Sequence, residues 1–339
     1  TTKLRLPALD SGEPLETTLL LMNLYGKIDT KIMLQMVKRL IEGDRRSLAR
    51  AISMVDNNDP DSHGIVREIF SLTGRSKTIG FTGPAGSGKS SLIGALVSNF
   101  KSLGHRVAVL AVDPTSPITG GAILGDRVRM QVTMEDNDVF MRSLASRGAV
   151  GGVSKSLRNV IRILDVAGFD LILVESVGAG QLEVQISEIV DITIVVLNPQ
   201  SGDNIQSIKA GLNEIGDIYA INKGDLEGAG NLFGSILEFV GDTTRKPSVL
   251  KVSARTREGV PNLATLIDEK LISNNTHIKE KKRNMLRNEL EEMIVQALER
   301  RAKSLLKDNS LYEDYVTMLI EKKIDPYLAA ERVSAEILK

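Results

Sequence analysis

The sequence predicts an α/β fold in which a doubly wound, mostly parallel sheet is flanked by helical regions at both ends of the chain. Three observations support this prediction. Short apolar runs rich in β-branched residues alternate with amphipathic stretches from residue 77 to residue 271. These runs are continuously apolar, as expected of parallel strands that are buried on both faces. The regions before and after them show apolar side chains at helical spacing instead.

The first region, residues 1–75, is predicted to be helical. Apolar side chains recur at helical spacing over Ile32–Ile41, directly after Asp29–Thr30, which we expect to cap this helix. Gly43 then ends the helix, and Asp44 is placed to cap the next one. The turn-forming residues 57–60 interrupt that second helix.

The central region, residues 76–272, holds the predicted sheet. Alternation of strands and helices over this length indicates a doubly wound arrangement, in which ligands bind beyond the carboxyl ends of the strands. The predicted strands are Thr78–Thr82, Val107–Val112, Leu171–Val174, Ile192–Leu197, Ile218–Ile221 and Val249–Val252.

The last region, residues 273–339, is predicted to be a helical arm. We expect a hinge at Asn274–Asn275, then a charged helix over Lys279–Lys307, and a further helical piece from Leu311 that is interrupted near Pro326. The charged helix has one apolar face. From the residues alone, that face fits packing against the chain's own domain as well as it fits contact with a second copy.

Composition excludes several classes of function. The 339 residues include 43 Lys and Arg and 43 Asp and Glu, so the net charge gives no general attraction to nucleic acid or to an anionic membrane. The absence of Cys excludes disulfides, thiolate metal sites and Cys nucleophiles. No apolar run approaches the roughly 18 residues that a membrane span needs, and no secretory leader is recognisable. We expect a soluble, cytoplasmic protein.

A glycine-rich motif follows the first predicted strand. Residues 83–90 match G-x-x-x-x-G-K-[ST], which would occur by chance in roughly 1% of chains of this length, and a helical stretch follows. Backbone N–H groups of such a loop surround phosphates, helped by the positive end of the next helix. We expect Lys89 to reach the β- and γ-phosphates and the Ser90 hydroxyl to bind Mg²⁺. The predicted phosphate-binding residues are Gly83, Ala85, Gly86, Ser87, Gly88, Lys89, Ser90 and Ser91.

A second motif predicts the base of the nucleotide. Residues 222–225 follow a predicted strand and match N-K-x-D. A carboxylate at Asp225 can accept from guanine N1–H and from the exocyclic amino group together, whereas adenine presents a lone pair there. Two such charge-assisted hydrogen bonds discriminate by roughly 10²- to 10⁴-fold. The predicted guanine-binding residues are Asn222, Lys223, Asp225, Ser253 and Ala254.

Two acidic residues lie where predicted strands end. Asp113 follows Val107–Val112, and Glu175 follows Leu171–Val174. At the carboxyl edge of an open sheet these side chains are candidates for Mg²⁺ ligands, or for groups that hold its waters, because Mg²⁺ prefers oxygen and keeps several waters. Acidic residues after strands are also common in ordinary loops, so the residues alone leave both interpretations open.

The segment after Glu175 has the spacing of a nucleotide switch. Gly178 lies three residues after the acid, where the backbone of such a switch senses the γ-phosphate. The next residue is Ala179, whereas Ras-like enzymes have a water-positioning Gln there. We therefore expect slow intrinsic hydrolysis that a partner or a rearrangement accelerates.

Residues 113–130 form the most distinctive stretch of the chain. Turn residues, Gly and Pro come first, and Asp126, Arg127 and Arg129 follow. One interpretation is a mobile loop beside the γ-phosphate that brings a second carboxylate and arginine donors. The other is a surface loop with solvated charges.

Together these motifs resemble the MeaB/ArgK family of GTPases, which includes the methylmalonic aciduria type A protein. The resemblance is carried by D-P-T-S-P-x-T-G-G-A-I-L-G-D-R-x-R-M from Asp113, by E-S-V-G-A-G-Q-L-E from Glu175 and by N-K-x-D, and it extends from Ile32 to the C-terminus. It implies a P-loop GTPase of the SIMIBI class that binds GTP or GDP with Mg²⁺. It further implies a homodimer that acts as a chaperone of adenosylcobalamin-dependent methylmalonyl-CoA mutase, gating cofactor loading and protecting the mutase.

The resemblance also implies roles for individual positions. Glu175–Gly178 would be the second switch, residues 273–339 the dimerisation arm, and Pro199–Lys209 a third switch that responds to the mutase. Gln200 departs from the P-G-x-G-D that is usual in that third switch. The candidate Mg²⁺ set is Ser90, Asp113, Asp126 and Glu175, and the candidate catalytic set is Lys89, Asp126, Arg129, Glu175 and Gly178.

Two other functions stay open. An ArgK-type kinase or ATPase of basic amino-acid transport would phosphorylate a periplasmic binding protein, although no residue points to recognition of a basic amino acid. A regulatory GTP-binding dimer without a chaperone cycle is the other. A metallochaperone is disfavoured because His63, His105 and His277 are far apart in sequence and Cys is absent.

Overall fold

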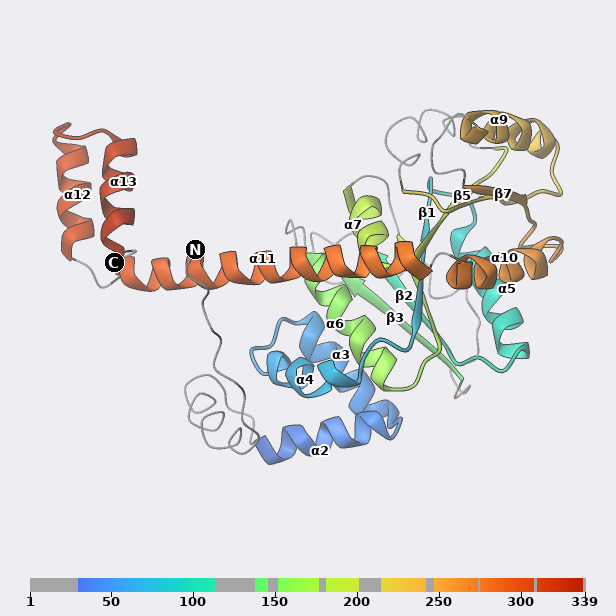
Figure 1. Cartoon of the computed structure of the whole chain (residues 1–339), viewed down its shortest axis with the longest axis horizontal. Coiled ribbons are helices and arrows are strands. Elements are labelled where there is room, and N and C mark those ends of the chain that lie inside the picture. Colours follow the sequence, from blue (N-terminus) through green and yellow to red (C-terminus); the bar gives the residue numbers. More distant parts are fainter. Residues whose placement is uncertain are drawn as a thin grey trace, which may run out of the picture. The chain divides into compact units, whose positions relative to one another are not determined.

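The protein is described from a computed structural model that covers residues 30–113, 138–145, 152–176, 181–200, 215–241, 247–273, 275–307 and 310–337. The chain divides into two compact units, Thr1–Ile278 and Lys279–Lys339. Figure 1 labels elements of both units and colours them along the chain. Among the described helices, none has the length and apolar character that would let it cross a membrane.

The first unit is built around a parallel sheet, which in the described part of the chain has seven strands in the order β3-β2-β4-β1-β5-β6-β7. The central strand β1 therefore has β4 on one side and β5 on the other. The chain completes the β2, β3 and β4 side before it crosses β1 to continue with β5. Strand bounds are β1 (Lys77–Thr82), β2 (Val107–Asp113), β3 (Val139–Ala145), β4 (Leu171–Ser176), β5 (Ile192–Leu197), β6 (Ile218–Ile221) and β7 (Ser248–Lys251).

This topology confirms the predicted doubly wound α/β fold. Each of the six predicted strands is present, with ends that differ by at most two residues from the prediction. The strand β3 was not predicted. Its sequence mixes apolar residues with Arg142 and Ser143, because it lies at the edge of the sheet and pairs with β2 alone among the described strands.

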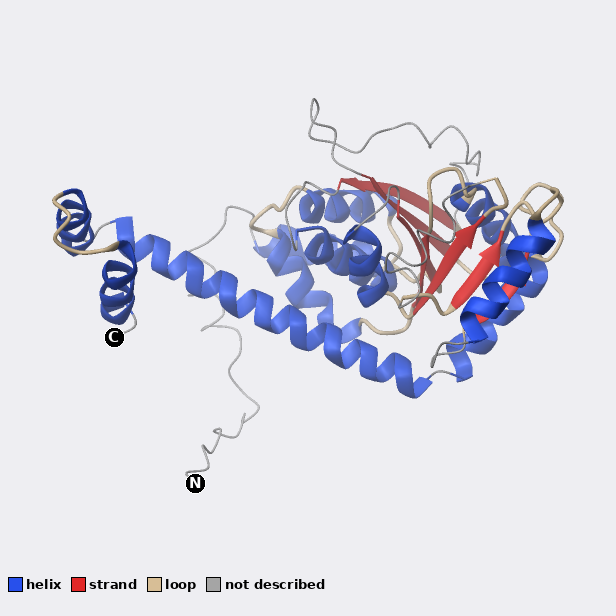
Figure 2. Cartoon of the chain, turned by 90° about the horizontal axis from the view of Figure 1, so that it is seen from above, coloured by secondary structure: helices blue, strands red, loops and turns tan. Residues whose placement is uncertain are grey.

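Helices cover both faces of the sheet (Figure 2). On one face α5 (Lys89–Ser102) and α10 (Val260–Ser273) pack together and share a buried apolar cluster with Ile79 and Phe81 of β1. On the opposite face Gly80 lies against Ile186 of α7 (Gln181–Ile189), beside α6 (Gly152–Val166). A second cluster joins β5 and β6 to α9 (Ala229–Gly241).

The N-terminal helices begin and end at local signals that the sequence predicted. They are α2 (Thr30–Ile41), α3 (Arg45–Asp56) and α4 (Ser62–Ile69), followed by the short 3₁₀ helix η1 (Phe70–Leu72). Gly43, with a φ of 82°, ends the turn after α2. The Asp44 carboxylate accepts from Ser47 N at 2.8 Å and caps α3. These capping hydrogen bonds hold the pKa of Asp44 below its ordinary value.

The N-terminal helices also cover the edge of the sheet and pack on α6. Arg45 of α3 donates to the Val139 carbonyl of β3 at 2.6 Å, and Arg142 of β3 donates to Ser53 Oγ of α3 at 2.9 Å. Covering an edge strand satisfies polar groups that would otherwise template pairing with another chain. This tertiary contact accounts for a strand that its own sequence hardly predicts.

The second unit is helical. It contains most of α11 (Asn275–Lys307), together with α12 (Ser310–Ile320) and α13 (Pro326–Ile337). The break predicted at Asn274–Asn275 lies where α10 gives way to α11, but α11 begins at Asn275 rather than at the predicted Lys279. The interruption predicted near Pro326 is confirmed, because α13 begins there.

Candidate functional site

The phosphate loop connects β1 to α5 at the carboxyl edge of the sheet. Its three glycines have positive φ, 132° at Gly83, 75° at Gly86 and 88° at Gly88. Two of them also lie against other atoms of the site. A Cβ at Gly83 would collide with the carbonyl oxygen of Val196, and a Cβ at Gly88 would collide with the side-chain amide of Asn222. Glycine is therefore required at both positions, for conformation and for close approach.

Lys89 opens α5 and turns back over the loop. Its Nζ donates to the Gly83 carbonyl at 2.8 Å and to the Pro84 carbonyl at 3.1 Å, and the residue is only 7% exposed. The positive charge is thus held inside the curve of the loop, where the sequence predicts phosphates. Around it Ala85, Gly86 and Ser91 are exposed, whereas Ser87 is buried.

Ser90 and Glu175 meet across the sheet edge. The Ser90 hydroxyl donates to Glu175 Oε1 at 2.6 Å, and Glu175 is buried. Glu175 lies within β4 rather than after it, opposite Phe81 of β1 in the parallel register. Because the hydroxyl donates its hydrogen bond to the carboxylate, both lone pairs of the Ser90 oxygen remain available to a cation.

Several predicted site residues lie wholly or partly outside the described residues. Asp113 ends β2 at the same edge of the sheet, but its side chain lies outside the described residues, as do Asp126, Arg129 and Gly178. The described residues thus bring together Ser90 and Glu175 of the predicted Mg²⁺ set. They contain no cluster of three or more His, Cys, Asp or Glu side chains that could hold a metal by itself.

The side chain of Asn222 joins the phosphate loop to the loops after β6 and β7. Its Nδ2 donates to the carbonyls of Ser87 at 3.0 Å and Gly88 at 3.2 Å, and its Oδ1 accepts from Ala254 N at 3.1 Å. Asn222 is 2% exposed, so these bonds form in a dry environment where they are rigidly directed. The two sequence motifs are therefore physically connected by one side chain.

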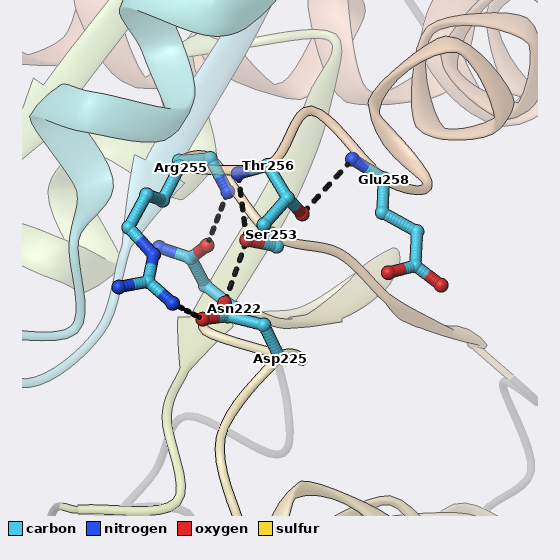
Figure 3. Close-up of polar contacts among 7 residues, drawn as sticks. Asn222, Asp225, Ser253, Arg255, Thr256 and Glu258 are labelled. Atoms are coloured by element: carbon cyan, nitrogen blue, oxygen red, sulfur yellow. Dashed lines mark hydrogen bonds and ion pairs between the residues drawn. The ribbon is translucent and has the colours of Figure 1, made fainter.

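Asp225 lies in the same loop, and its carboxylate is shared by two donors (Figure 3). Ser253 Oγ donates to Oδ1 at 2.7 Å, and Arg255 Nη2 lies 2.5 Å from Oδ2. The hydrogen bond from Ser253 is the main cause that holds the pKa of Asp225 below its ordinary value, with smaller help from Arg255 against the opposing effect of burial. The carboxylate therefore stays ionised to a lower pH than an ordinary aspartate does.

Sequence reasoning did not predict the contacts of three polar residues of this site: Asn198 and Arg255 were not selected, and Gln200 was noted only as part of the expected third switch. Asn198, directly after β5, donates to the Gly86 carbonyl at 3.2 Å and accepts from Gln200 N at 2.8 Å. Gln200 in turn accepts from Lys223 Nζ at 2.9 Å. The position of Asn198 after an apolar strand was an available signal, the same one that selected Asp113. For the contacts of Gln200 and Arg255 the sequence offered none.

Comparison with known proteins identifies the family. The family model for "Methylmalonyl Co-A mutase-associated GTPase MeaB" matches residues 48–307. A Pyrococcus horikoshii protein assigned as a GTPase is 39% identical over 313 residues, covering 90% of this chain and 98% of that protein. The Escherichia coli GTPase ArgK is 33% identical over 248 residues, covering 70% of this chain and 75% of its own length.

Two further similarities extend this comparison. A mitochondrial methylmalonic aciduria type A homolog of Caenorhabditis briggsae is 31% identical over 264 residues, which cover 71% of this chain and 64% of that one. The crystal structure of a LAO/AO transport system kinase matches with a TM-score of 0.65 and 24% identity, covering 93% of this chain and all of that one; this likeness shows the shared fold. The chain belongs to the family of methylmalonyl-CoA mutase-associated GTPases and is itself a P-loop GTPase.

Proposed function

We propose that this chain binds GTP with Mg²⁺ at the carboxyl edge of β1 and hydrolyses it slowly until a partner accelerates the reaction. The observation that carries the proposal is the position of Asn222, whose side chain holds the phosphate loop and the base loop in one hydrogen-bonded unit. A single nucleotide that contacts both loops fits this arrangement, because each end of the ligand then meets a preorganised surface.

In this proposal the phosphates lie in the loop between β1 and α5. The N-terminus of α5 presents backbone N–H groups and the positive end of its dipole to them. Lys89 supplies the localised positive charge that the β- and γ-phosphates require, from its position beside the Gly83 and Pro84 carbonyls. The transferred phosphoryl group is stabilised by electrostatics rather than by covalent chemistry.

Ser90 and Glu175 fit a Mg²⁺ ion beside these phosphates. The donor set is all oxygen, and the hydroxyl is oriented by a buried carboxylate at 2.6 Å. A few protein ligands suffice because Mg²⁺ keeps several waters and takes further oxygens from the phosphates. Bound there, the ion would neutralise charge that develops on the phosphate oxygens. Ser90 would bind it, and Glu175 would orient Ser90 and hold a water.

The guanine base would lie between the loops after β6 and β7. Asp225 reads the two donors of the base, the loop at Ser253 and Ala254 borders its carbonyl oxygen, and the Ser253 hydroxyl donates to the Asp225 carboxylate and lowers its pKa. Lys223 borders the base from a backbone with a φ of 56°. Asp126, Arg129 and Gly178 would complete the catalytic set from segments outside the described residues.

We further propose that the GTP cycle serves an adenosylcobalamin-dependent methylmalonyl-CoA mutase, as a chaperone that gates cofactor loading. The name of the family and the methylmalonic aciduria homolog support this partner. The position of Ala179 after Gly178, where a water-positioning Gln is absent, supports a slow intrinsic rate. The alternative kinase function of basic amino-acid transport has no supporting residue in the described part of this chain, although the matched crystal structure is that of a LAO/AO transport system kinase.

The helical unit is proposed to mediate homodimerisation, with the region boundaries near residues 75 and 272 that the sequence predicts. Large apolar side chains with exposed fractions of 43–59% follow one stripe of α11 at helical spacing. Such a stripe is stabilised when a second apolar surface covers it. Light scattering on the full chain tests this, with a dimer mass expected. The side chains are Leu286, Leu290, Met293, Ile294 and Leu298.

The assignment of the base is tested by Asp225→Asn. An amide offers a donor where guanine also has donors, so preference should move from GTP to XTP, measured by competition against a fluorescent nucleotide. Glu227→Gln is the matched control, since it removes the same charge two residues away on an exposed side chain. Unchanged GTP preference in Asp225→Asn would remove this residue from base recognition.

A further inference from the structure

The Asp225 carboxylate has two protein donors that differ sharply in how firmly they are held. Ser253 is 1% exposed, its hydroxyl accepts from Thr256 N at 3.1 Å, and its backbone N donates to the Glu258 carbonyl at 2.9 Å. The Arg255 side chain is 77% exposed, and its bond to Asp225 is its one polar contact with the described part of the chain. Ser253 is therefore fixed, whereas Arg255 is free to leave.

Little of the carboxylate remains uncovered beside these donors. The residue as a whole is exposed, but the Asp225 side chain is only 14% exposed, with Ser253 on Oδ1 and Arg255 on Oδ2. Reading guanine requires two further donors in one plane, one toward each oxygen. A carboxylate can accept more than two hydrogen bonds, but a planar bidentate ligand needs room beside both oxygens of a side chain that is only 14% exposed. The exposed guanidinium is the donor that can move into water at small cost and make that room.

We propose that Arg255 competes with the guanine base for Asp225, so that nucleotide association is coupled to release of this ion pair. The inference rests on the base-reading role of Asp225 proposed above and assigns a new role to its neighbour. Arg255 acts as a specificity-determining residue: a base with two suitable donors displaces the guanidinium, and a base without them leaves it in place. Breaking the Arg255–Asp225 ion pair lowers guanine affinity only slightly, because an exposed ion pair is weak.

The effect has a defined sign and size. Arg255→Ala removes the competitor and leaves Ser253 to hold the carboxylate, so GDP should bind roughly two- to five-fold more tightly. The gain in GDP affinity should appear mainly in the association rate, because the Asp225 carboxylate is then open to the base in every molecule rather than only in those whose ion pair is broken. The GDP affinity of Arg255→Lys should lie between those of the wild type and Arg255→Ala, since a lysine retains the charge but not the planar fork of donors.

The experiment is stopped-flow and equilibrium binding of a fluorescent GDP to the full chain. Arg257→Ala is the matched control: it removes the same charge from the same loop, and Arg257 is exposed without a polar side-chain contact to the described residues. We expect tighter binding for Arg255→Ala and no change for Arg257→Ala. Equal or weaker binding by Arg255→Ala would overturn the proposal, because the guanidinium would then be positioning the carboxylate rather than competing for it.

A double-mutant cycle ties the effect to Asp225. In the Asp225→Asn background, probed with XDP, Arg255→Ala should give no gain, since the ion pair is already absent. A gain of the same size there would show that Arg255 acts elsewhere and would overturn the proposal. Failure of the wider function looks different: wild-type protein would bind ADP as well as GDP, whereas failure of this inference alone leaves guanine preference intact.

Discussion

Replacing Asn222 with alanine should destabilise the folded chain and weaken nucleotide binding at the same time. The variant loses two donated hydrogen bonds to the phosphate loop and one accepted from Ala254 N. Each net hydrogen bond contributes about 0.5–1.5 kcal/mol, and buried partners left unsatisfied add to the loss. The expected decrease in the free energy of unfolding is therefore about 2–4 kcal/mol.

The same loss should appear in affinity, because nucleotide binding then has to order two loops that Asn222 normally holds together. Converted to a binding constant, about 2–4 kcal/mol corresponds to GDP binding that is roughly 30- to 700-fold weaker. Urea denaturation and calorimetric titration with GDP measure the two quantities on the same preparation.

Asn198→Ala is the matched control for this experiment. Asn198 is 1% exposed, donates to the Gly86 carbonyl of the phosphate loop and accepts from Gln200 N. It should lose stability while retaining a clear preference for GDP over ADP. Wild-type GDP affinity in folded Asn222→Ala would refute the claim that this side chain unites the two halves of the site.

Three further substitutions test separate parts of the site and its support. Lys89→Ala should remove tight GTP binding, because the charge held over the phosphate loop is lost; retained micromolar affinity in titration calorimetry would contradict the phosphate assignment. Ser253→Ala should raise the lowered pKa of Asp225 toward its ordinary 3.8. The stability that the ionised carboxylate contributes, and GDP affinity with it, should then be lost at a higher pH than in the wild type when the protein is titrated with acid. An acid titration that is the same in the variant and the wild type would argue against this hydrogen bond. Asp165→Ala leaves the N–H groups of residues 74–76 without their buried acceptor and should lower the free energy of unfolding by about 3–5 kcal/mol in urea, with guanine preference unchanged.

Strand positions were predictable where burial on both faces demanded continuous apolar sequence. β1, β4 and β5 are buried along nearly their whole length, and each keeps an apolar run although β1 contains Lys77 and Thr82 and β4 ends in Glu175 and Ser176. The edge strand β3 lacks this signal. Its place depends on hydrogen bonds with α3, a segment about ninety residues earlier in the chain, and local pattern cannot contain such information.

The functional site likewise has parts that the sequence predicts and parts that it does not. The phosphate loop was predictable because its backbone conformation requires glycine at 83 and 88. Base recognition was predictable because the residues that perform it form the short motif at 222–225. Arg255 looks like any exposed loop residue in the sequence. Its contact exists because the loops after β6 and β7 are neighbours in the folded sheet, a consequence of topology rather than of spacing.

GTP turnover by the purified chain, measured with and without an adenosylcobalamin-dependent methylmalonyl-CoA mutase from the same organism, tests the central claim most directly. We expect slow turnover by the chain alone and clear stimulation by the mutase, with Lys89→Ala inactive under both conditions. GTP turnover that is the same with and without the mutase would contradict the chaperone function, although the chain would still be a GTPase. Turnover that persists in Lys89→Ala would contradict the site itself.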